Sequence, residues 1–81
     1  LEDYVIPIVK LMWSGSDHMQ AFKKIARDLD VRLETVRAQC TRTLGLTTKE
    51  FVAMVKSKEI VQHLKKKYAD QYQTIVLQLK E

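Results

Sequence analysis

Apolar residues recur at intervals of three and four positions along most of the chain, which is the spacing of one face of an α-helix. Short segments rich in Ser, Gly, Asp and Thr interrupt the pattern, and these residues end one helix and begin the next. With 2 Gly and 1 Pro in 81 residues, the chain has few turn residues for a many-stranded β fold. We therefore expect an all-α domain of five or six helices.

The helical periodicity divides into six segments. Their expected bounds are Glu2 to Trp13, Asp17 to Leu29, Leu33 to Leu44, Thr48 to Lys56, Lys58 to Tyr68 and Asp70 to Leu79. A composition of 46% hydrophobic and 30% charged residues is typical of a globular chain, and the length suffices for one domain. We expect residues 1–81 to form a single domain, with a trihelical core from the first three helices. The last three would brace that core or mediate dimerisation.

The breaks between the segments carry residues that cap helices. Ser16 or Asp17 can accept the free N–H groups at the start of the second helix, and Ser57 can do the same for the fifth. The run Thr47-Thr48-Lys49-Glu50 fits a capping box, with the first Thr as N-cap. Gly45 suits the left-handed conformation that often follows the last residue of a helix. These residues indicate that the third helix ends, and the fourth begins, close to Gly45.

The charge balance is mildly basic, with 14 Lys and Arg against 10 Asp and Glu and a formal net charge of +4. This balance suits a nucleic-acid partner, and it also suits many ordinary soluble domains. No apolar run approaches the length of about 18 residues that a membrane span needs, and no signal-peptide pattern is present. We therefore expect a soluble, cytoplasmic domain with no membrane partner. Because the chain begins with Leu1 rather than Met, we also expect it to be part of a longer protein.

Residues with reactive or metal-binding side chains are few. Cys40 is the single cysteine, so no internal disulfide can form, and its place in the apolar stripe of the third helix favours a buried thiol over a reactive one. His18 and His63 have no Cys or carboxylate at metal-ligand spacing. No nucleophile–base pair, phosphate loop or carboxylate pair is present. We therefore expect no metal, no cofactor and no enzymatic activity within these residues.

The most informative stretch is residues 25–37, Ile-Ala-Arg-Asp-Leu-Asp-Val-Arg-Leu-Glu-Thr-Val-Arg. Ala26 is small enough for a close crossing of two helices. Leu29, Val31 and Val36 are placed to wedge those helices at a fixed angle. A fixed angle lets the second helix project into the major groove of DNA, which admits one α-helix. The stretch therefore predicts two helices joined by a tight turn.

The segment from about Phe22 to Leu44 resembles the helix-turn-helix of bacterial regulators, particularly the LuxR-type domains and region 4 of sigma factors. The shared pattern is held here by Ile25, Ala26, Leu29, Val31, Thr35 and Val36. The resemblance implies a DNA-binding, targeting domain of a larger bacterial protein in transcription regulation. The turn of this pattern usually has Gly where the chain has Asp30, which tolerates the left-handed conformation better than most residues. Arg32 stands where a Ser cap is common, so Asp30 is a candidate cap for a third helix that starts slightly earlier.

The resemblance also implies which residues meet double-stranded DNA. The helix at about 33–44 would enter the major groove, while basic side chains hold the phosphate backbone. The candidate DNA-binding residues on this helix and its flank are Arg32, Glu34, Thr35, Arg37, Ala38, Thr41 and Arg42, and those on the preceding helix are Lys23, Lys24 and Arg27. Arg suits paired hydrogen bonds to guanine or phosphate, and a Thr near a helix N-terminus suits a backbone phosphate.

Other functions fit the same sequence. Helix-turn-helix folds also serve as protein-interaction modules, and a surface on the last three helices is the alternative site. Asp30 and Glu34 favour that alternative, whereas the arginines of the third helix and its flank favour DNA. RNA binding is a further alternative. Lys65-Lys66-Lys67 is either a second phosphate patch or a solvated helix end, where cations suit the helix dipole, and we adopt the second interpretation. A second copy of the chain, or domains of the parent protein, are further expected partners.

Overall fold

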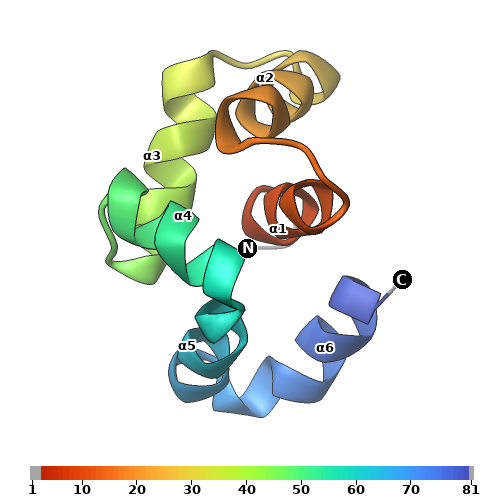
Figure 1. The fold of residues 1–81 in the computed structure, drawn as a ribbon, viewed down its shortest axis with the longest axis vertical. Coiled ribbons are helices and arrows are strands. Elements are labelled where there is room, and N and C mark those ends of the chain that lie inside the picture. The colour runs from red at the N-terminus through yellow and green to blue at the C-terminus, as the bar shows by residue number, and fades with distance from the viewer. Residues whose placement is uncertain (1–2, 81) are drawn as a thin grey trace.

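Six α-helices and one short 3-10 turn follow one another along residues 3–80, the part of the chain that the computed structural model describes (Figure 1). The helices are α1 (Val5–Trp13), α2 (His18–Leu29), α3 (Leu33–Leu44), α4 (Thr48–Ser57), α5 (Glu59–Lys67) and α6 (Tyr72–Lys80), and the 3-10 turn η1 covers Ala69–Gln71. Residues 3–80 contain no strand. The predicted all-α fold is therefore confirmed, and the predicted helix start at Glu2 lies outside the described residues.

Most of the predicted caps explain the helix ends. Asp17 accepts a 2.8 Å hydrogen bond from a main-chain N–H in the first turn of α2. Thr47 and Glu50 form both hydrogen bonds of a capping box at the start of α4, at 3.1 and 3.0 Å. The prediction that Ser57 caps α5 is confirmed only in part: its hydroxyl accepts a 3.4 Å hydrogen bond from the N–H of Glu59 at the start of α5, but Ser57 is not the N-cap residue. Ser57 is the last residue of α4, and the cap between the two helices is Lys58, which has a left-handed backbone with φ 66°.

Helix α1 lies at the centre of the fold and packs against α2, α4 and α6 (Figure 1). Its buried residues are Val5, Ile6, Ile8 and Val9. A helix that is covered on several sides needs apolar residues on several sides, so its pattern is broader than one stripe. Helix α2 packs against both α1 and α3, whereas α1 packs mainly against α2, α4 and α6 rather than against α3. Because α1 also contacts α4 and α6, the later helices share this core rather than bracing it from outside.

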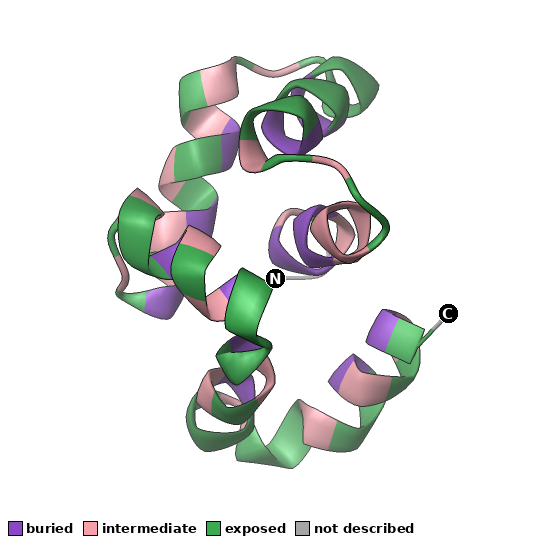
Figure 2. Ribbon diagram, in the orientation of Figure 1, coloured by how far each residue is buried: buried purple, intermediate pink, exposed green. Residues whose placement is uncertain are grey.

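Two phenylalanines fill the core between α2 and α4. The rings of Phe22 and Phe51 are fully buried and stack with their centroids 6.3 Å apart and an interplanar angle of 20°. Such aromatic pairs stabilise a fold by about 0.5–1.5 kcal/mol beyond the burial itself. Val36, Cys40 and Leu44 continue the core along one face of α3 (Figure 2). That face packs toward α2 and α4, and it leaves the opposite face of α3 toward solvent.

Candidate nucleic-acid interface

The turn between α2 and α3 sets the direction in which α3 leaves α2. The N–H of Val31 donates a 2.9 Å hydrogen bond to the carbonyl of Ala26, and the N–H of Asp30 donates a 3.2 Å bond to the carbonyl of Arg27. Asp30 has a left-handed backbone, with φ 55° and ψ 49°. This arrangement is the Schellman ending of a helix, in which the left-handed residue is usually Gly. Asp30 therefore ends α2, and the prediction that it caps α3 is wrong.

The start of α3 has no side-chain cap. Arg32 is the N-cap residue, its backbone is extended, and its side chain makes no capping hydrogen bond. Glu34 lies in the first turn, where a negative charge suits the positive end of the helix dipole. The Arg32 guanidinium therefore extends into solvent beside a helix end whose N–H groups have no side-chain acceptor.

The contacts that hold α2 and α3 at their angle differ from the prediction at one residue. Val36 is fully buried, Ala26 is 8% exposed and Val31 packs against the core, as expected. Leu29 is 42% exposed and is therefore not one of the residues that pack between α2 and α3. It is the last residue of α2, and the chain turns away directly after it. The small residue at Ala26 and the turn residue at Val31 thus set the angle without Leu29.

The predicted DNA-binding residues of α3 and its flank differ in exposure. Arg32, Glu34, Arg37 and Arg42 are exposed, whereas Thr35, Ala38 and Thr41 are half-buried. Residues 3–80 contain one ion pair, on α2, so the three arginines have no acidic partner in that range. Arg37 and Arg42 are five positions apart and therefore project about 140° apart around the helix axis. Arg37 and Arg42 therefore lie toward opposite edges of the exposed side of α3, where each unpaired guanidinium group favours anions.

Thr41 has a more limited role than the sequence predicts. Its hydroxyl oxygen lies 3.0 Å from the carbonyl of Arg37 and 3.2 Å from the carbonyl of Ala38. The hydroxyl proton is therefore directed at the helix itself, and the oxygen can only accept a further hydrogen bond. Phosphate oxygens also only accept, so Thr41 in this rotamer does not suit a phosphate. It suits an amino group on a base edge instead.

The three predicted cations of α2 do not form one group. Lys23 and Arg27 are exposed and, four positions apart, lie on the same side of the helix. Lys24 forms an exposed ion pair with Asp28 at 3.2 Å, and it lines a groove with residues of α1 and α6. No residue of α3 lines that groove. Lys24 thus differs from Lys23 and Arg27 in having an acidic partner, and all three stay predicted candidates for backbone contacts.

Two side chains, His63 in the middle of α5 and Tyr68 directly after it, hold the C-terminal end of α3. Nε2 of His63 lies 2.9 Å from the carbonyl oxygen of Leu44, and the hydroxyl of Tyr68 donates a 3.3 Å hydrogen bond to the carbonyl of Thr43. The last turn of a helix leaves its carbonyls without partners within the helix. His63 and Tyr68 satisfy two of them and fix α5 against α3, although the whole of α4 separates them in sequence.

This contact brings a second group of cations toward α3. Lys65, Lys66 and Lys67 are exposed in the last turn of α5. Nζ of Lys67 lies 3.8 Å from where a Cβ of Gly45 would be, directly after α3. Nζ of Lys65 lies 5.5 Å from the centre of the Tyr72 ring. No pattern in the sequence indicated that this lysine run and Gly45 are neighbours.

Cys40 is fully buried, and burial raises the pKa of its thiol to about 12, so the thiol is protonated and shielded near neutral pH. Among residues 3–80, no group of three or more His, Cys, Asp or Glu side chains is arranged to hold a metal ion. No helix in this range has the length and apolar character needed to cross a membrane.

Comparison with known proteins identifies no relative of this chain. No protein-family model matches it, and neither a curated protein nor a solved structure does. Its function is therefore inferred from its own residues and their geometry.

Proposed function

We propose that this domain binds duplex DNA through α3, as the targeting module of a larger bacterial protein in transcription regulation. The observation that carries the proposal is that Arg37 and Arg42 of α3, and Arg32 directly before it, are exposed without an acidic partner among residues 3–80. Guanidinium groups bind phosphate, and also O6 and N7 of guanine, through paired hydrogen bonds. The major groove is wide enough for one helix that carries such groups.

The way α3 is held supports the same role. Its buried stripe, Val36, Cys40 and Leu44, packs on the core along three turns, so the helix is rigid where it would meet DNA. Both ends are also fixed, by the turn at Asp30 and by the side chains of α5. A rigid helix loses little conformational freedom on binding, which favours affinity.

Glu34, the acidic residue among the predicted DNA-binding residues of α3, indicates which part of the helix would contact bases rather than phosphates. Glu34 is exposed in the first turn of α3 and repels phosphate there. A carboxylate can instead accept a hydrogen bond from N4 of cytosine in the major groove. We therefore assign base reading to the first half of α3 and to Thr41, and backbone contacts to Arg42, with Lys23 and Arg27 on α2.

A titration with short duplex DNA at low salt tests the proposal. Main-chain amide shifts are expected at residues 32–42 and near Lys23 and Arg27. Replacing a phosphate-binding Arg by Ala lowers the slope of log K against log salt by about 0.9. Replacing an Arg that reads guanine costs roughly 1–3 kcal/mol and relaxes the preference at one base pair. Lys56→Ala is the matched control, because it removes one exposed cation from α4.

The position of the shifts decides the result. Far-UV circular dichroism first establishes that each variant keeps its helices. If no amide shift appears at residues 32–42, or if Lys65–Lys67 alone respond, α3 is not a DNA-reading helix. Equal losses of DNA affinity in Arg37→Ala and Lys56→Ala would mean that binding depends on net charge alone.

A protein-interaction role for helices 4 to 6 is the second candidate, and one observation favours it. Leu77 on α6 is 63% exposed, and with Tyr72 and Val76 it lines a shallow hollow of about 310 Å³. Exposed apolar side chains that gather on one helix face mark interaction surfaces in many proteins. If this surface binds a protein or a second copy, Leu77→Ser weakens that association and leaves DNA binding unchanged.

A further inference from the structure

A groove runs along α1 between α2 and α6. Two hollows of about 390 and 450 Å³ form it, and they share Lys10 and Leu11. The first hollow extends to Ile6 near the start of α1, and the second extends to Trp13 at its end. The two therefore follow the whole of α1, whose nine residues span about 13 Å. We call this feature the α1 groove.

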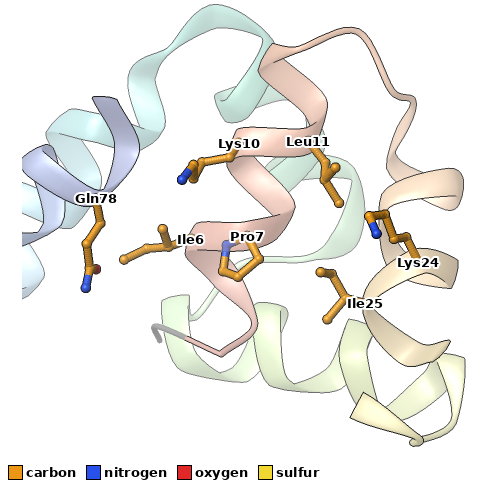
Figure 3. Close-up of a pocket in the computed structure, with 7 residues that line it drawn as sticks. All are labelled: Ile6, Pro7, Lys10, Leu11, Lys24, Ile25 and Gln78. Carbon is orange, nitrogen blue, oxygen red and sulfur yellow. The ribbon is translucent and has the colours of Figure 1, made fainter. Parts of the chain in front are cut away.

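The floor of the α1 groove is apolar. Figure 3 shows Leu11 of α1 and Ile25 of α2 facing each other, with Pro7 near them and Ile6 extending from α1 toward α6. Ile6 and Ile25 are almost buried, so the groove exposes the edges of core side chains. A floor of this kind receives apolar side chains from a partner in the way that a helix lies in a hydrophobic groove.

The sides of the α1 groove are basic. Lys10, Lys24 and Lys80 come from α1, α2 and α6, and no acidic residue lines either hollow within the part of the chain described. The ammonium of Lys24 is paired with Asp28, but an exposed pair of this type contributes little and exchanges readily with another carboxylate. Three cations around an apolar floor are complementary to an apolar stripe flanked by Asp or Glu.

Gln78 of α6 supplies a polar group on one wall of the groove. Its Oε1 atom is buried, and among the side chains described it is the one buried nitrogen or oxygen atom without a hydrogen-bond partner. Figure 3 shows Ile6 and Lys10 extending toward the side of the groove where Gln78 lies. A buried acceptor without a donor is unfavourable. Because this atom is enclosed, a donor on a bound segment would reach it only after the Gln78 side chain rotates toward the groove.

We infer that the α1 groove binds an acidic, amphipathic helix of a partner protein. The apolar stripe of that helix lies on the floor, its carboxylates meet the three lysines, and about three helical turns match the length of α1. A second copy of this chain is a poor occupant, because its net charge of +4 would be brought against the same lysines. Helices α3 and α6 stand at opposite sides of the fold, so this contact leaves most of α3 free (Figure 1).

A synthetic helix tests the inference on the intact domain. The probe has about three turns, with Leu on one face and Glu beside it, and a charge-reversed peptide carries Lys in place of Glu. The expected result is a set of amide shifts at Ile6, Leu11, Ile25 and Gln78 that only the acidic peptide causes. Trp13 is the single tryptophan and lines the second hollow, so its fluorescence follows the same binding.

A pair of charge-reversal variants then tests the lysines. Lys10→Glu with Lys24→Glu is expected to weaken binding of the acidic peptide about tenfold at low salt, a change of about 1.4 kcal/mol. Lys23→Glu with Lys66→Glu is the matched control, because it changes the charge equally at exposed lysines outside the groove. If the first pair loses helicity, Lys10→Gln with Lys24→Gln replaces it, with a smaller loss of affinity expected.

Several results would overturn the inference. One is an absence of groove shifts at about millimolar peptide. A second is equal binding of the acidic and charge-reversed peptides, and a third is an equal effect of the two charge-reversal pairs. Shifts confined to Tyr72, Val76 and Leu77 would place the contact on the outer face of α6 instead. Anionic vesicles that cause the groove shifts when the acidic peptide does not would show that a lipid surface is the occupant.

Discussion

The indole N–H of Trp13 donates a 2.9 Å hydrogen bond to the main-chain carbonyl of Val55 and so joins the end of α1 to the last turn of α4. The same carbonyl accepts the N–H of Lys58 at 3.2 Å, and Nζ of Lys58 lies 5.6 Å from the centre of the Trp13 ring. Three contacts therefore meet at the point where the chain leaves α4. Because Trp13 and Val55 are 42 positions apart, this bond ties the first part of the fold to the second.

Trp13→Phe should destabilise the domain by about 1–2 kcal/mol. The variant keeps an aromatic ring but removes the N–H donor and part of the packed surface. Urea denaturation followed by circular dichroism is the suitable measurement, because the variant has no tryptophan left to report. Lys58→Asn serves as the comparison, since it removes the cation above the ring and keeps a residue that tolerates the left-handed backbone. A larger loss in Lys58→Asn than in Trp13→Phe would assign the stability to the cation rather than to the hydrogen bond.

Asp30→Gly should raise the free energy of unfolding by about 0.5 kcal/mol, and Asp30→Ala should lower it by roughly 1 kcal/mol. The left-handed backbone at this position, with φ 55°, strains a residue that has a Cβ, and Asp bears that strain better than Ala does. Asp28→Gly is the control on the same helix, where Gly should destabilise instead. Urea midpoints at constant slope give the comparison. If Asp30→Gly and Asp28→Gly change the free energy of unfolding in the same direction, the left-handed turn assigned to Asp30 is contradicted.

Ala26→Leu should lower the free energy of unfolding by about 1–3 kcal/mol. Ala26 is 8% exposed on α2, which packs against both α1 and α3, so a larger side chain must displace core residues. Ala53→Leu makes the same change at an exposed position of α4, where we expect a change within about 0.5 kcal/mol. Chemical denaturation measures both. Equal midpoints for Ala26→Leu and the parent domain would show that Ala26 is not at a helix crossing.

Glu50 should make stability depend on pH in acid. The main-chain N–H and the hydroxyl of Thr47 lower the pKa of the Glu50 carboxyl, in that order of importance. A depressed pKa in the folded state means that this contribution is complete above the ordinary glutamate pKa of about 4.3 and is lost as the pH falls through the lower folded-state value. Glu50→Gln keeps an acceptor for the Thr47 N–H and does not titrate.

The measurement for Glu50 is the thermal midpoint across this acid range. The parent domain should lose more stability on acidification than Glu50→Gln does. Near neutral pH, the thermal midpoints of the two proteins should change in parallel. Identical acid profiles would mean that the capping box contributes nothing through the charge of Glu50.

The helix ends could be predicted because each depends on residues within one or two turns. Asp17, Gly45 and the pair Thr47 and Glu50 act on N–H and carbonyl groups only a few positions away. The prediction for Ser57 differs from the structure because the end of α4 and the start of α5 meet at this residue. Ser57 is the last residue of α4, and its hydroxyl lies 3.3 Å from a carbonyl of α4 while it also accepts a 3.4 Å hydrogen bond from the N–H of Glu59 in α5.

The candidate site was predictable in part for the same reason. The exposed arginines of α3 follow from its buried stripe, because helical periodicity places polar residues opposite Val36 and Cys40. The groove that Lys24 lines was not predictable, since it depends on Gln78 of α6 lying on the same side of the fold. The direction of the Thr41 hydroxyl was not predictable either, because the side-chain rotamer determines whether the hydroxyl faces the helix backbone or solvent.

The sequence by itself determined the six helices, most of their caps and the apolar face of each helix, because these features follow from the backbone hydrogen bonds and the 3.6-residue period of one segment. Tertiary structure alone decided which helix covers which face. It placed α1 among three neighbours, left Leu29 exposed, and brought Lys67 beside Gly45. A periodic pattern indicates only that one face of a helix is buried, and many arrangements of neighbouring helices can bury that face. The choice among them depends on how all the side chains pack together, which no single segment contains.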